Sequence, residues 1–514
     1  MKRLAFHPES RNFENHTWKG VCTLKHQLNL LAFDLGASNG RGILGRFDGE
    51  RIEMQELHRF ENDYIGLNGV LYWDSLNLFQ QMKQALYAFR RAGLGDLASF
   101  GIDTWGVDYG LLDRSGQLLG NPRSYRYAED EDMEAVWKTV PFRTLFQRSG
   151  VGAYSYNTVY QLYRRRLEQD AALEHADALL FMPDLLGYFF SGEKASEYTI
   201  ATTSALYNPM LRDWDRQTIR DLGLPEHIFQ PLDRAGQLRG RLLPELSEET
   251  GVNRAALAAV GGHDTASAVA AIPGEGNFAF CSSGTWSLFG VETEQPILTD
   301  AVREANFTNE GTVQGGFRPL RNIMGLWLIQ ECRRGWARAG RRYSWDEIVS
   351  MAEAEPPLRS IIDPDAPEFF GAGNMEQKIR TFCARTGQPV PETPGQTARC
   401  IYESLALKYR WALERLEEIK GTRLDTLNIV GGGIQNKLLN QMAADALDRP
   451  VITGPIEGAA IGNLLLQAVA LGELKDIAEV RQVVRSSEVV KTYGPRHTQA
   501  WEDAYARLLS FLAP

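Results

Sequence analysis

The stretch LNLLAFDLGASNGRGILGRFDG, residues 28–49, combines an apolar run, a short turn rich in glycine and serine, and a second apolar run. Apolar runs bounded by Gly, Ser and Asn are typical of β-strands joined by a tight turn. A second stretch, GNFAFCSSGTWSLFGVET at residues 276–293, has the same form. Two such hairpins in one chain indicate two related domains, each of which opens with one hairpin.

Strand-like and helix-like patterns alternate along most of the 514 residues, which favours an α/β fold. A chain of this length exceeds one compact unit and suggests two large domains. Pro273 and Gly276 interrupt the pattern just before the second hairpin. The expected organisation is an N-terminal extension at residues 1–24, a first domain at residues 25–272 and a second domain at residues 273–514.

The composition is that of an ordinary globular protein, with 44% apolar and 23% charged residues. The net charge of −10 disfavours binding to nucleic acid or to an anionic membrane surface. No apolar run approaches the roughly 20 residues of a membrane-spanning helix, and the N-terminus lacks the apolar core of a signal peptide. The five cysteines are scattered, which argues against a zinc site and fits the reducing cytoplasm.

The first hairpin turn, Asp34 to Arg41, could bind phosphate oxygens through its backbone N–H groups, because Gly36 and Gly40 permit conformations that side chains forbid. Asp34 could place Mg²⁺ through water. The alternative is a plain hairpin in which Asp and Asn only make the turn. The second turn, Ser282 to Ser287, offers hydroxyls and a glycine in the same place. Two such turns facing each other would form a clamp for ATP.

Three consecutive glycines, Gly431 to Gly433, follow an apolar strand and precede a helical pattern in LNIVGGGIQN, residues 427–436. Glycines in this place let the backbone pass close to a flat ring or a phosphate near a helix N-terminus. The alternative is a tight strand-to-helix turn, and no Lys follows as it would in a P-loop. The place of these three glycines, between a strand and a helix, favours the binding of a ligand.

The stretch GGHDTASAV, residues 261–269, places His263 and Asp264 between glycines and a helix of small residues. Asp264 could cap this helix. It could also be the general base that accepts a proton from a sugar hydroxyl. An ordinary ionised Asp suffices for that role, because a largely dissociative phosphoryl transfer needs the proton removed late.

Two more stretches could contact a sugar. GIDTWGVDYGLLD, residues 101–113, is an apolar strand pattern with two aspartates, and buried carboxylates are costly unless they are hydrogen-bonded. NIMGLWLIQECRR begins with Asn322, and Gln330 lies about two helical turns further on nearly the same face. A buried strand and a packed helix whose polar residues have no chemical role are the alternatives.

Together, and in this order, the motifs resemble the FGGY family of carbohydrate kinases. The matching pieces span residues 30 to about 470 and are DLGAS-GR, GIDTWGVDYGLLD, EYT-ATTS, HDTASAV, SSGTWSL, FTNEG, NIMGLW, VGGGIQN and GP-E--AIGN. The resemblance implies two actin-like, ribonuclease H-like α/β domains with the active site in the cleft between them. It also implies transfer of the γ-phosphoryl group of ATP, with Mg²⁺, to O1 of a ketose.

The resemblance further implies roles for single residues. Asp264 is the expected base, and Asp34 is expected to place Mg²⁺ through water. The residues expected to bind ATP are Ala37, Ser38, Asn39, Gly40, Arg41, Thr285, Gln330, Gly432 and Gly433. The residues expected to bind the ketose are Gly106, His263, Asp264, Thr265 and Asn322.

Within the family, DTWGVD, SSGTWSL and NIMGLW are most similar to the enzymes that act on L-rhamnulose. Three departures fall around the sugar: Tyr127 stands where an Asp is expected, GVGAYSYNT at residues 150–158 keeps only the last two residues of its pattern, and Gly261-Gly262 precede His263. L-Rhamnulose is the first expectation, with L-fuculose, L-xylulose or another pentulose as alternatives. A sensor that binds ATP and sugar without transfer, and an ATPase of the Hsp70 or actin kind, are the rivals from other classes. A monomer or a homodimer is expected.

Overall fold

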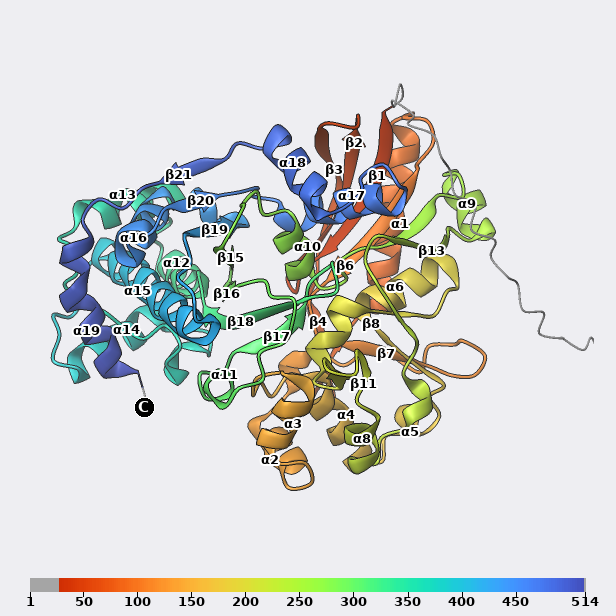
Figure 1. Cartoon of the computed structure of the whole chain (residues 1–514), viewed down its shortest axis with the longest axis horizontal. Coiled ribbons are helices and arrows are strands. Elements are labelled where there is room, and N and C mark those ends of the chain that lie inside the picture. Colours follow the sequence, from red (N-terminus) through yellow and green to blue (C-terminus); the bar gives the residue numbers. More distant parts are fainter. Residues whose placement is uncertain (1–26, 513–514) are drawn as a thin grey trace, which may run out of the picture.

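A computed structural model of the chain describes residues 27–512, so the predicted extension at residues 1–24 lies outside the described residues. Figure 1 shows two lobes, one built mainly from the red-to-yellow half of the chain and the other from the cyan-to-blue half. Each lobe is organised around one large sheet.

The first sheet contains six strands. They are β1 Leu28–Leu35, β2 Asn39–Phe47, β3 Ile52–Glu61, β6 Ser99–Thr104, β13 Gln237–Arg241 and β14 Ala256–Ala259. Their order across the sheet is β13-β14-β6-β1-β2-β3. Strand β2 pairs antiparallel with both β1 and β3, whereas β6 pairs in parallel with both β1 and β14.

The second sheet contains seven strands. They are β15 Phe278–Ser283, β16 Trp286–Gly290, β17 Thr308–Gly311, β18 Phe317–Met324, β19 Thr426–Val430, β20 Val451–Thr453 and β21 Lys491–Tyr493. Their order is β17-β18-β16-β15-β19-β20-β21. The run β18-β16-β15-β19-β20 has the same order and directions as β3-β2-β1-β6-β14. Both predicted hairpins are therefore present, and each one opens a sheet of the same topology.

The remaining strands form four two-stranded sheets. They are β4 Tyr64–Leu67, β5 Val70–Trp73, β7 Tyr109–Leu112, β8 Ala178–Phe181, β9 Ser196–Glu197, β10 Tyr207–Asn208, β11 Asp213–Trp214 and β12 Leu232–Asp233. The helices are α1 Ser75–Arg91, α2 Asp130–Trp137, α3 Phe142–Ser149, α4 Thr158–Leu167, α5 Ala171–Glu174, α6 Met182–Ser191, α7 Tyr198–Ala201, α8 Arg216–Asp221, α9 Pro244–Thr250, α10 Asp264–Ala270, α11 Asp300–Glu304, α12 Trp327–Arg338, α13 Trp345–Ala354, α14 Met375–Arg385, α15 Pro394–Lys420, α16 Lys437–Leu447, α17 Gly458–Ala470, α18 Ile477–Ser487 and α19 Glu502–Phe511.

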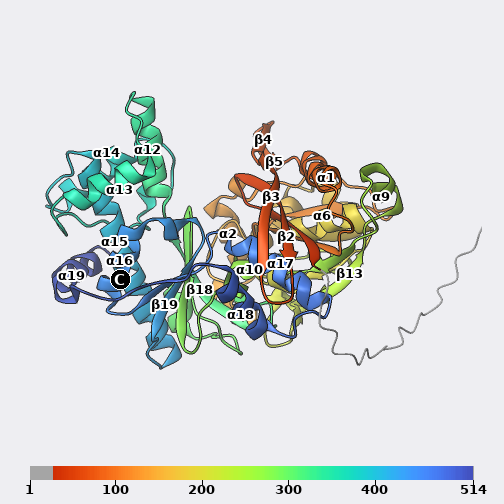
Figure 2. The same ribbon diagram turned by 90° about the horizontal axis from the view of Figure 1, so that it is seen from above.

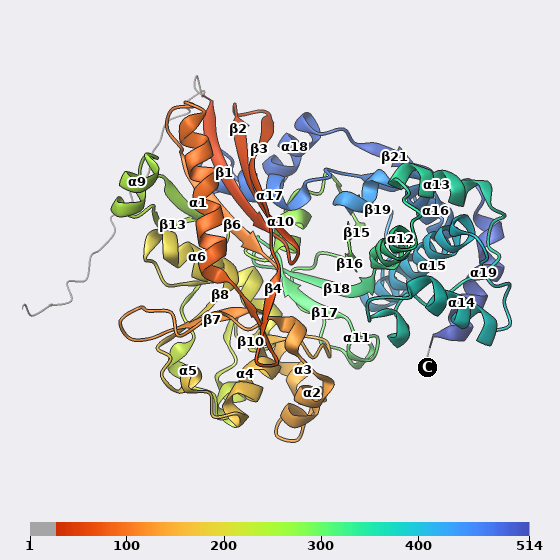
Figure 3. The ribbon, with the colours of Figure 1, turned by 180° about the vertical axis from the view of Figure 1, so that it is seen from behind.

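Strand β1 is buried on both faces, and its side chains alternate between two cores. Leu31 and Phe33 pack in the core that includes residues of α1 and α6, the helices on the face seen in Figure 3. Leu30 and Ala32 pack on the opposite face, in a core with residues of α17. Side chains alternate along a strand, so Asp34 points to the same face as Leu30 and Ala32. Its carboxylate is therefore directed to the face on which α17 packs.

Helices α10 and α17 join the two halves of the molecule. Helix α17 comes from the second half of the chain, yet it packs across β1, β6 and β14 of the first sheet. Figure 2 shows α18 beside α17 and β3, whereas the blue helices α16 and α19 lie in the other lobe. Helix α10 packs against α17 and, through Ala268 and Val269, against Phe280 of β15. The expected domain boundary after residue 272 falls between α10 and β15 and stays a prediction.

Two further features concern the described residues as a whole. Within residues 27–512, the structure contains no helix with the length and apolar character needed to cross a membrane. The four cysteines in this part of the chain are buried and unbridged, and they are Cys281, Cys332, Cys383 and Cys400.

The crossing of α10 and α17 should be sensitive to a single methyl group. A Cβ on Gly462 of α17 would lie 1.9 Å from the carbonyl oxygen of Ser267 in α10, so Gly462→Ala must move backbone. We expect the variant to lose about 1–3 kcal/mol of stability through overpacking, although Ala is the better helix former by about 1 kcal/mol. Gly335→Ala in α12 is the control, because its Cβ would meet nothing within 4 Å. Thermal unfolding measures both, and an unchanged midpoint for Gly462→Ala would contradict the close crossing.

Candidate active site

A cavity of about 650 Å³ lies where α10 and α17 meet the two sheets. It is lined by both hairpin turns, by the triple-glycine turn and by the first residues of α10 and α17. A cavity of this size fits ligands of several hundred cubic ångströms. Strands β1 and β6 end at this cavity and pair in parallel, as do β15 and β19 in the second sheet. The carboxyl edge of parallel strands is where open α/β sheets bind ligands.

Most of the predicted site residues meet in this cavity. Those that line it are Asp34, Ala37, Ser38, Asn39, Arg41, Gly106, His263, Asp264, Thr265, Thr285, Asn322 and Gly432. Residues separated by hundreds of positions thus form one surface, and both halves of the chain contribute to it.

Three of the predicted residues lie behind the cavity wall. A Cβ on Gly40 would lie 2.3 Å from the ring of Phe60, so this glycine is required by packing within the sheet. A Cβ on Gly433 would lie 2.0 Å from Ser283 Oγ. Gln330 reaches the wall indirectly, because its Oε1 accepts a hydrogen bond from Thr285 Oγ1 at 3.3 Å.

Asp264 is the first residue of α10 and does not cap the helix. The N-cap position belongs to His263, which makes no side-chain capping bond. One oxygen of Asp264 accepts a hydrogen bond from Thr265 Oγ1 at 3.1 Å and lies 3.6 Å from His263 Nε2. The side chain is 31% exposed, and its exposed part faces the cavity. Its position deep in the cavity raises the pKa of Asp264, and Asp34 adds to this rise while His263 opposes it.

The loop at residues 261–265 carries Asp264, the predicted base, and is called the base loop. Two side chains hold its backbone. Glu197 Oε2 accepts a hydrogen bond from Gly262 N at 3.0 Å, and Thr199 Oγ1 accepts one from His263 N at 3.3 Å. A Cβ on Gly262 would lie 2.9 Å from the same Glu197 oxygen, and one on Gly261 would lie 2.8 Å from Ser267 N. Both glycines that depart from the family pattern are therefore required by close contacts beneath the loop.

The two hairpin turns present backbone to the cavity. Gly36 N donates to Asn39 O at 2.8 Å in the first turn, and Gly284 N donates to Trp286 O at 2.8 Å in the second. Both turns line the same cavity, as the predicted clamp requires. Gly431 of the triple-glycine turn also lines the cavity. Its φ of +90° is a conformation that favours glycine, and its backbone passes close to Ser283.

Asp34 lies in a group of charges at the end of β1. Its Oδ2 accepts a hydrogen bond at 2.5 Å from Arg41, which also pairs with Glu457 just before α17. Asp103 occupies the neighbouring position on β6, completely buried, and Asn463 donates to one of its oxygens at 2.5 Å. The other oxygen of Asp103 has no partner. Burial and the charge of Asp34 raise the pKa of Asp103 well above its ordinary value.

Aromatic residues form another part of the cavity wall. Asp108 does not face the cavity, and it accepts hydrogen bonds from the indoles of Trp73 and Trp105 and from the backbone of Tyr125. This buried carboxylate, whose pKa burial raises to about 6, therefore positions two cavity-lining aromatic residues. Val107, which sequence patterns did not single out, lines the wall at φ +70°, a strained conformation for a β-branched residue.

Of Tyr127 and Tyr156, which lie in the two segments that depart from the family pattern, Tyr156 lines the cavity and Tyr127 does not. Tyr156 contacts Asn322 there. Its hydroxyl accepts a hydrogen bond from Asn322 Nδ2 at 2.8 Å, which leaves Asn322 Oδ1 without a partner. Tyr127 does not line the cavity, and Arg164 both donates to its hydroxyl at 2.9 Å and stacks over its ring.

Sequence reasoning missed several residues of the wall. Glu310, Tyr154 and Glu457 all line the cavity. Glu310 lies in FTNEG and Glu457 in GP-E--AIGN, so the motifs signalled these two positions without indicating a role. Tyr154 had no signal beyond its place in the altered segment.

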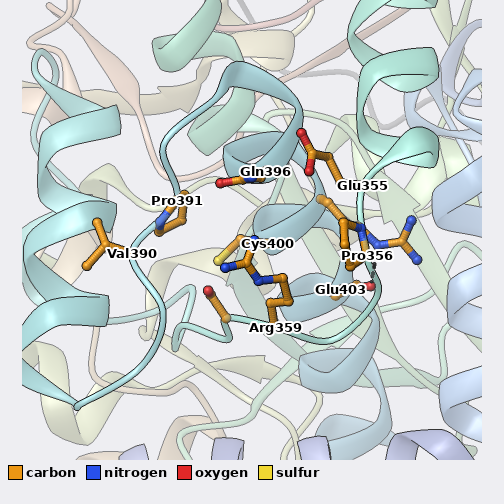
Figure 4. A pocket seen from close by; sticks show the side chains of 10 residues that line it. Glu355, Pro356, Arg359, Val390, Pro391, Gln396, Cys400 and Glu403 are labelled. Atoms are coloured by element: carbon orange, nitrogen blue, oxygen red, sulfur yellow. Dashed lines mark hydrogen bonds and ion pairs between the residues drawn. The ribbon is translucent and has the colours of Figure 1, made fainter.

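A second cavity lies in the second lobe, beside α15, and is shown in Figure 4. Its volume of about 10 Å³ is close to the minimum for one water molecule, so it has no room for a sugar or a nucleotide. Arg399 and Glu403 line it and already pair with each other at 2.7 Å. None of the predicted site residues lines it.

Comparison with solved structures defines the class of fold. The chain superposes over 94% of its length on the gluconate kinase from Lactobacillus acidophilus, with a TM-score of 0.77, 15% identity and 97% of that chain covered. The Plasmodium falciparum glycerol kinase with ADP gives a TM-score of 0.73 at 12% identity, covering 94% of this chain and 98% of that one. The fold is that of the two-domain sugar kinases, which confirms the predicted α/β fold with two actin-like domains.

The sequence itself narrows this class to a family. Residues 29–271 match the N-terminal domain, and residues 279–471 the C-terminal domain, of the FGGY family of carbohydrate kinases. The chain therefore belongs to the FGGY family of carbohydrate kinases, as its motifs indicated. It is an enzyme whose substrates are ATP and a sugar.

Similar proteins cover nearly the whole chain. The rhamnulokinase of Bacteroides thetaiotaomicron is 42% identical over 479 residues, which are 93% of this chain and 98% of that protein. The rhamnulokinase of Enterococcus faecalis is 39% identical over 468 residues, covering 90% and 93%. The rhamnulokinase of Bacillus subtilis is 37% identical over 467 residues, covering 90% and 95%.

Glu197, which holds the base loop through Gly262 N, should make the stability of the folded protein depend on pH. Burial raises the pKa of Glu197 from 4.5 to about 7, so between these values the folded chain keeps a proton that the unfolded chain releases. The free energy of unfolding then falls as pH rises through this window. Glu197→Gln cannot ionise, so its stability relative to the wild type should rise across the window, by on the order of 3 kcal/mol.

Urea unfolding at a series of pH values measures this difference. Glu248→Gln, on the exposed surface of α9, is the matched control and should follow the wild-type pH profile. Parallel profiles for Glu197→Gln and the wild type would show that Glu197 ionises normally.

Proposed function

We propose that the protein transfers the γ-phosphoryl group of ATP to O1 of L-rhamnulose, giving L-rhamnulose 1-phosphate and ADP. The sugar is supported by rhamnulokinases that are 37–42% identical over at least 90% of the chain. The observation that supports the chemistry is that Asp264 and the two hairpin turns, whose backbone suits phosphate, line one cavity. Kinases of L-fuculose, L-xylulose or another pentulose share this chemistry and are the alternatives.

The nucleotide occupies the side of the cavity formed by the two turns and the triple glycine. Backbone N–H groups of residues 37–40 and the hydroxyl of Thr285 bind phosphate oxygens, and Gln330 orients that hydroxyl. Arg41 turns from its carboxylate partners toward the phosphates. A Cβ on Gly432 would meet nothing within 4 Å, so this glycine leaves room for the adenosine, with Gly433 behind it.

Magnesium fits beside Asp34. Within residues 27–512, no group of three or more His, Cys, Asp or Glu side chains could hold a metal by itself. Mg²⁺ typically keeps several waters and takes one or two carboxylates plus substrate phosphates, and Asp34, which lines the cavity, suits that role. When bound, Mg²⁺ neutralises charge on the phosphates.

The ketose lies between Asp264 and the aromatic wall. Asp264 accepts the O1 proton as the phosphoryl group is transferred, and alignment in the closed cleft excludes water as a competing acceptor. Gly106 provides exposed backbone, and Thr265 provides a hydroxyl. His263 and Asn322 hold further sugar hydroxyls, since both line the cavity.

We place the reaction in the cytoplasm, where ATP is available and four buried, unbridged cysteines are stable. A monomer and a homodimer both fit, because residues of a single chain complete the cavity.

Replacing the base tests the chemical step. Asp264→Asn keeps the shape of the side chain but cannot accept the proton, so kcat should fall by about 10²–10⁴-fold while the KM for ATP changes little. Asp503→Asn, on an exposed position of α19, is the matched control and should have wild-type kinetics. A coupled assay of ADP release measures both, and near-normal turnover by Asp264→Asn would exclude Asp264 as the base.

A panel of ketoses tests the sugar. The assay of ADP release should give its highest kcat/KM with L-rhamnulose and lower values with L-fuculose and L-xylulose. A higher value for another ketose would reassign the substrate within the same chemistry. ADP release that does not depend on sugar would instead support an ATPase, and no turnover with any sugar would support a sensor.

A further inference from the structure

The ring of His263 is held from the second sheet by two charged residues. Glu310 of β17 places Oε2 3.0 Å from His263 Nδ1, and the same oxygen lies 3.0 Å from Nη2 of Arg318 on β18. Arg318 is completely buried and also donates its Nε–H to the carbonyl of Gly311 at 2.8 Å. We propose that Glu310, backed by Arg318, is a positioning residue that fixes the ring and the tautomer of His263 for sugar binding, a role that rests on the proposed kinase reaction.

Glu310 is ionised in this setting. Its side chain is only 8% exposed, and burial alone would raise its pKa. The nearby His263 and Arg318 outweigh burial and lower the pKa of Glu310 below its ordinary value. An ionised carboxylate can only accept hydrogen bonds.

The tautomer of His263 follows from this charge. His263 Nδ1 has two neighbours, the Glu310 oxygen at 3.0 Å and Arg318 Nη2 at 3.4 Å. If Nδ1 carried no proton, its lone pair would face the carboxylate at the shorter of these distances, and the two would repel. The carboxylate at 3.0 Å therefore favours the tautomer with the proton on Nδ1, facing Glu310.

The other ring nitrogen is then free for the substrate. In the neutral ring Nε2 carries a lone pair, and it lies 3.6 Å from Asp264 Oδ1. It also lies beside Gly106, since a Cβ there would be 3.4 Å from it. Nε2 can thus accept a hydrogen bond from a sugar hydroxyl next to the one that Asp264 deprotonates. A proton on Nε2 would instead bind Asp264 and occupy the base.

The contact belongs to a fixed junction between the two halves of the chain. On either side of Glu310, Asn309 N donates to Gly150 O at 2.8 Å and Gly311 N donates to Thr202 Oγ1 at 2.7 Å. These bonds tie β17 to the first half, so the carboxylate keeps its place beside His263. Glu310 also lines the cavity, which makes direct contact with the sugar the rival role.

Two substitutions separate positioning from direct contact. In Glu310→Gln the amide oxygen still accepts the Nδ1–H bond, so the tautomer and the KM for the ketose should stay close to wild type. In Glu310→Ala the bond is lost, and kcat/KM for the ketose should fall by about 10-fold, mainly through KM, with the KM for ATP unchanged. Steady-state kinetics on the full-length enzyme measures these constants.

The tautomer is measured directly. Long-range ¹H–¹⁵N spectra of the histidine rings, with the His263 signals identified by their loss in His263→Gln, should show Nδ1–H in the wild type and in Glu310→Gln. Glu310→Ala should lose this signature. The double variant Glu310→Met with Arg318→Met, which leaves no unpaired buried charge, should also lose it and so guards against a misfolded single variant.

Glu304→Gln is the matched control, because Glu304 is exposed on α11 and pairs with Arg303. It should change neither the tautomer nor the KM for the ketose. A wild-type ring protonated on Nε2, or equal losses in Glu310→Gln and Glu310→Ala, would overturn the proposal. Equal losses of kcat/KM for the ketose and for ATP in Glu310→Ala, with an unchanged tautomer, would also overturn the proposal. Absence of turnover with every ketose would contradict the proposed function instead, while the spectra of the sugar-free enzyme would still decide the role of Glu310.

Discussion

The close crossing of α10 and α17 is the contact on which the rest of the structure depends. Gly462 lies against the backbone carbonyl of Ser267, with no space for a Cβ between them. Ser267 Oγ in turn donates to Gly261 O at 2.8 Å, which ties the crossing to the base loop. Because interiors are close-packed, two helices can approach this closely only where one of them lacks a side chain.

This crossing determines what faces the cavity. Helix α10 presents Asp264 at its first turn, and α17 presents Gly458 at its own start. The partial positive charge and free N–H groups of a helix N-terminus favour anions, which suits a site where phosphate charge gathers. Since α10 also packs on β15 while α17 packs on the first sheet, the two hairpin turns come to lie on either side of one cavity.

A chain of buried amides holds α17 in register on the first sheet. Ser99 Oγ donates to Gln467 Oε1 at 2.8 Å, Gln467 Nε2 donates to Asn463 Oδ1 at 2.8 Å, and Asn463 donates to Asp103. Buried polar groups are costly unless bonded, so a shift of the helix along the sheet would break several bonds at once. The same network places the carboxylate of Asp103 directly behind Asp34.

Local pattern determined much of this protein from sequence alone. The two hairpins, the helix after Asp264 and the triple-glycine turn follow from side-chain periodicity and from glycine's freedom, which act over a few neighbouring residues. Tertiary structure alone decided that Gly40 and Gly433 lie behind the wall, that His263 rather than Asp264 occupies the N-cap position of α10, and that Glu310 faces a ring 47 positions earlier in the chain. Such contacts depend on how sheets and helices pack against one another. The spacing of residues along the chain does not indicate which distant groups will lie within hydrogen-bonding distance.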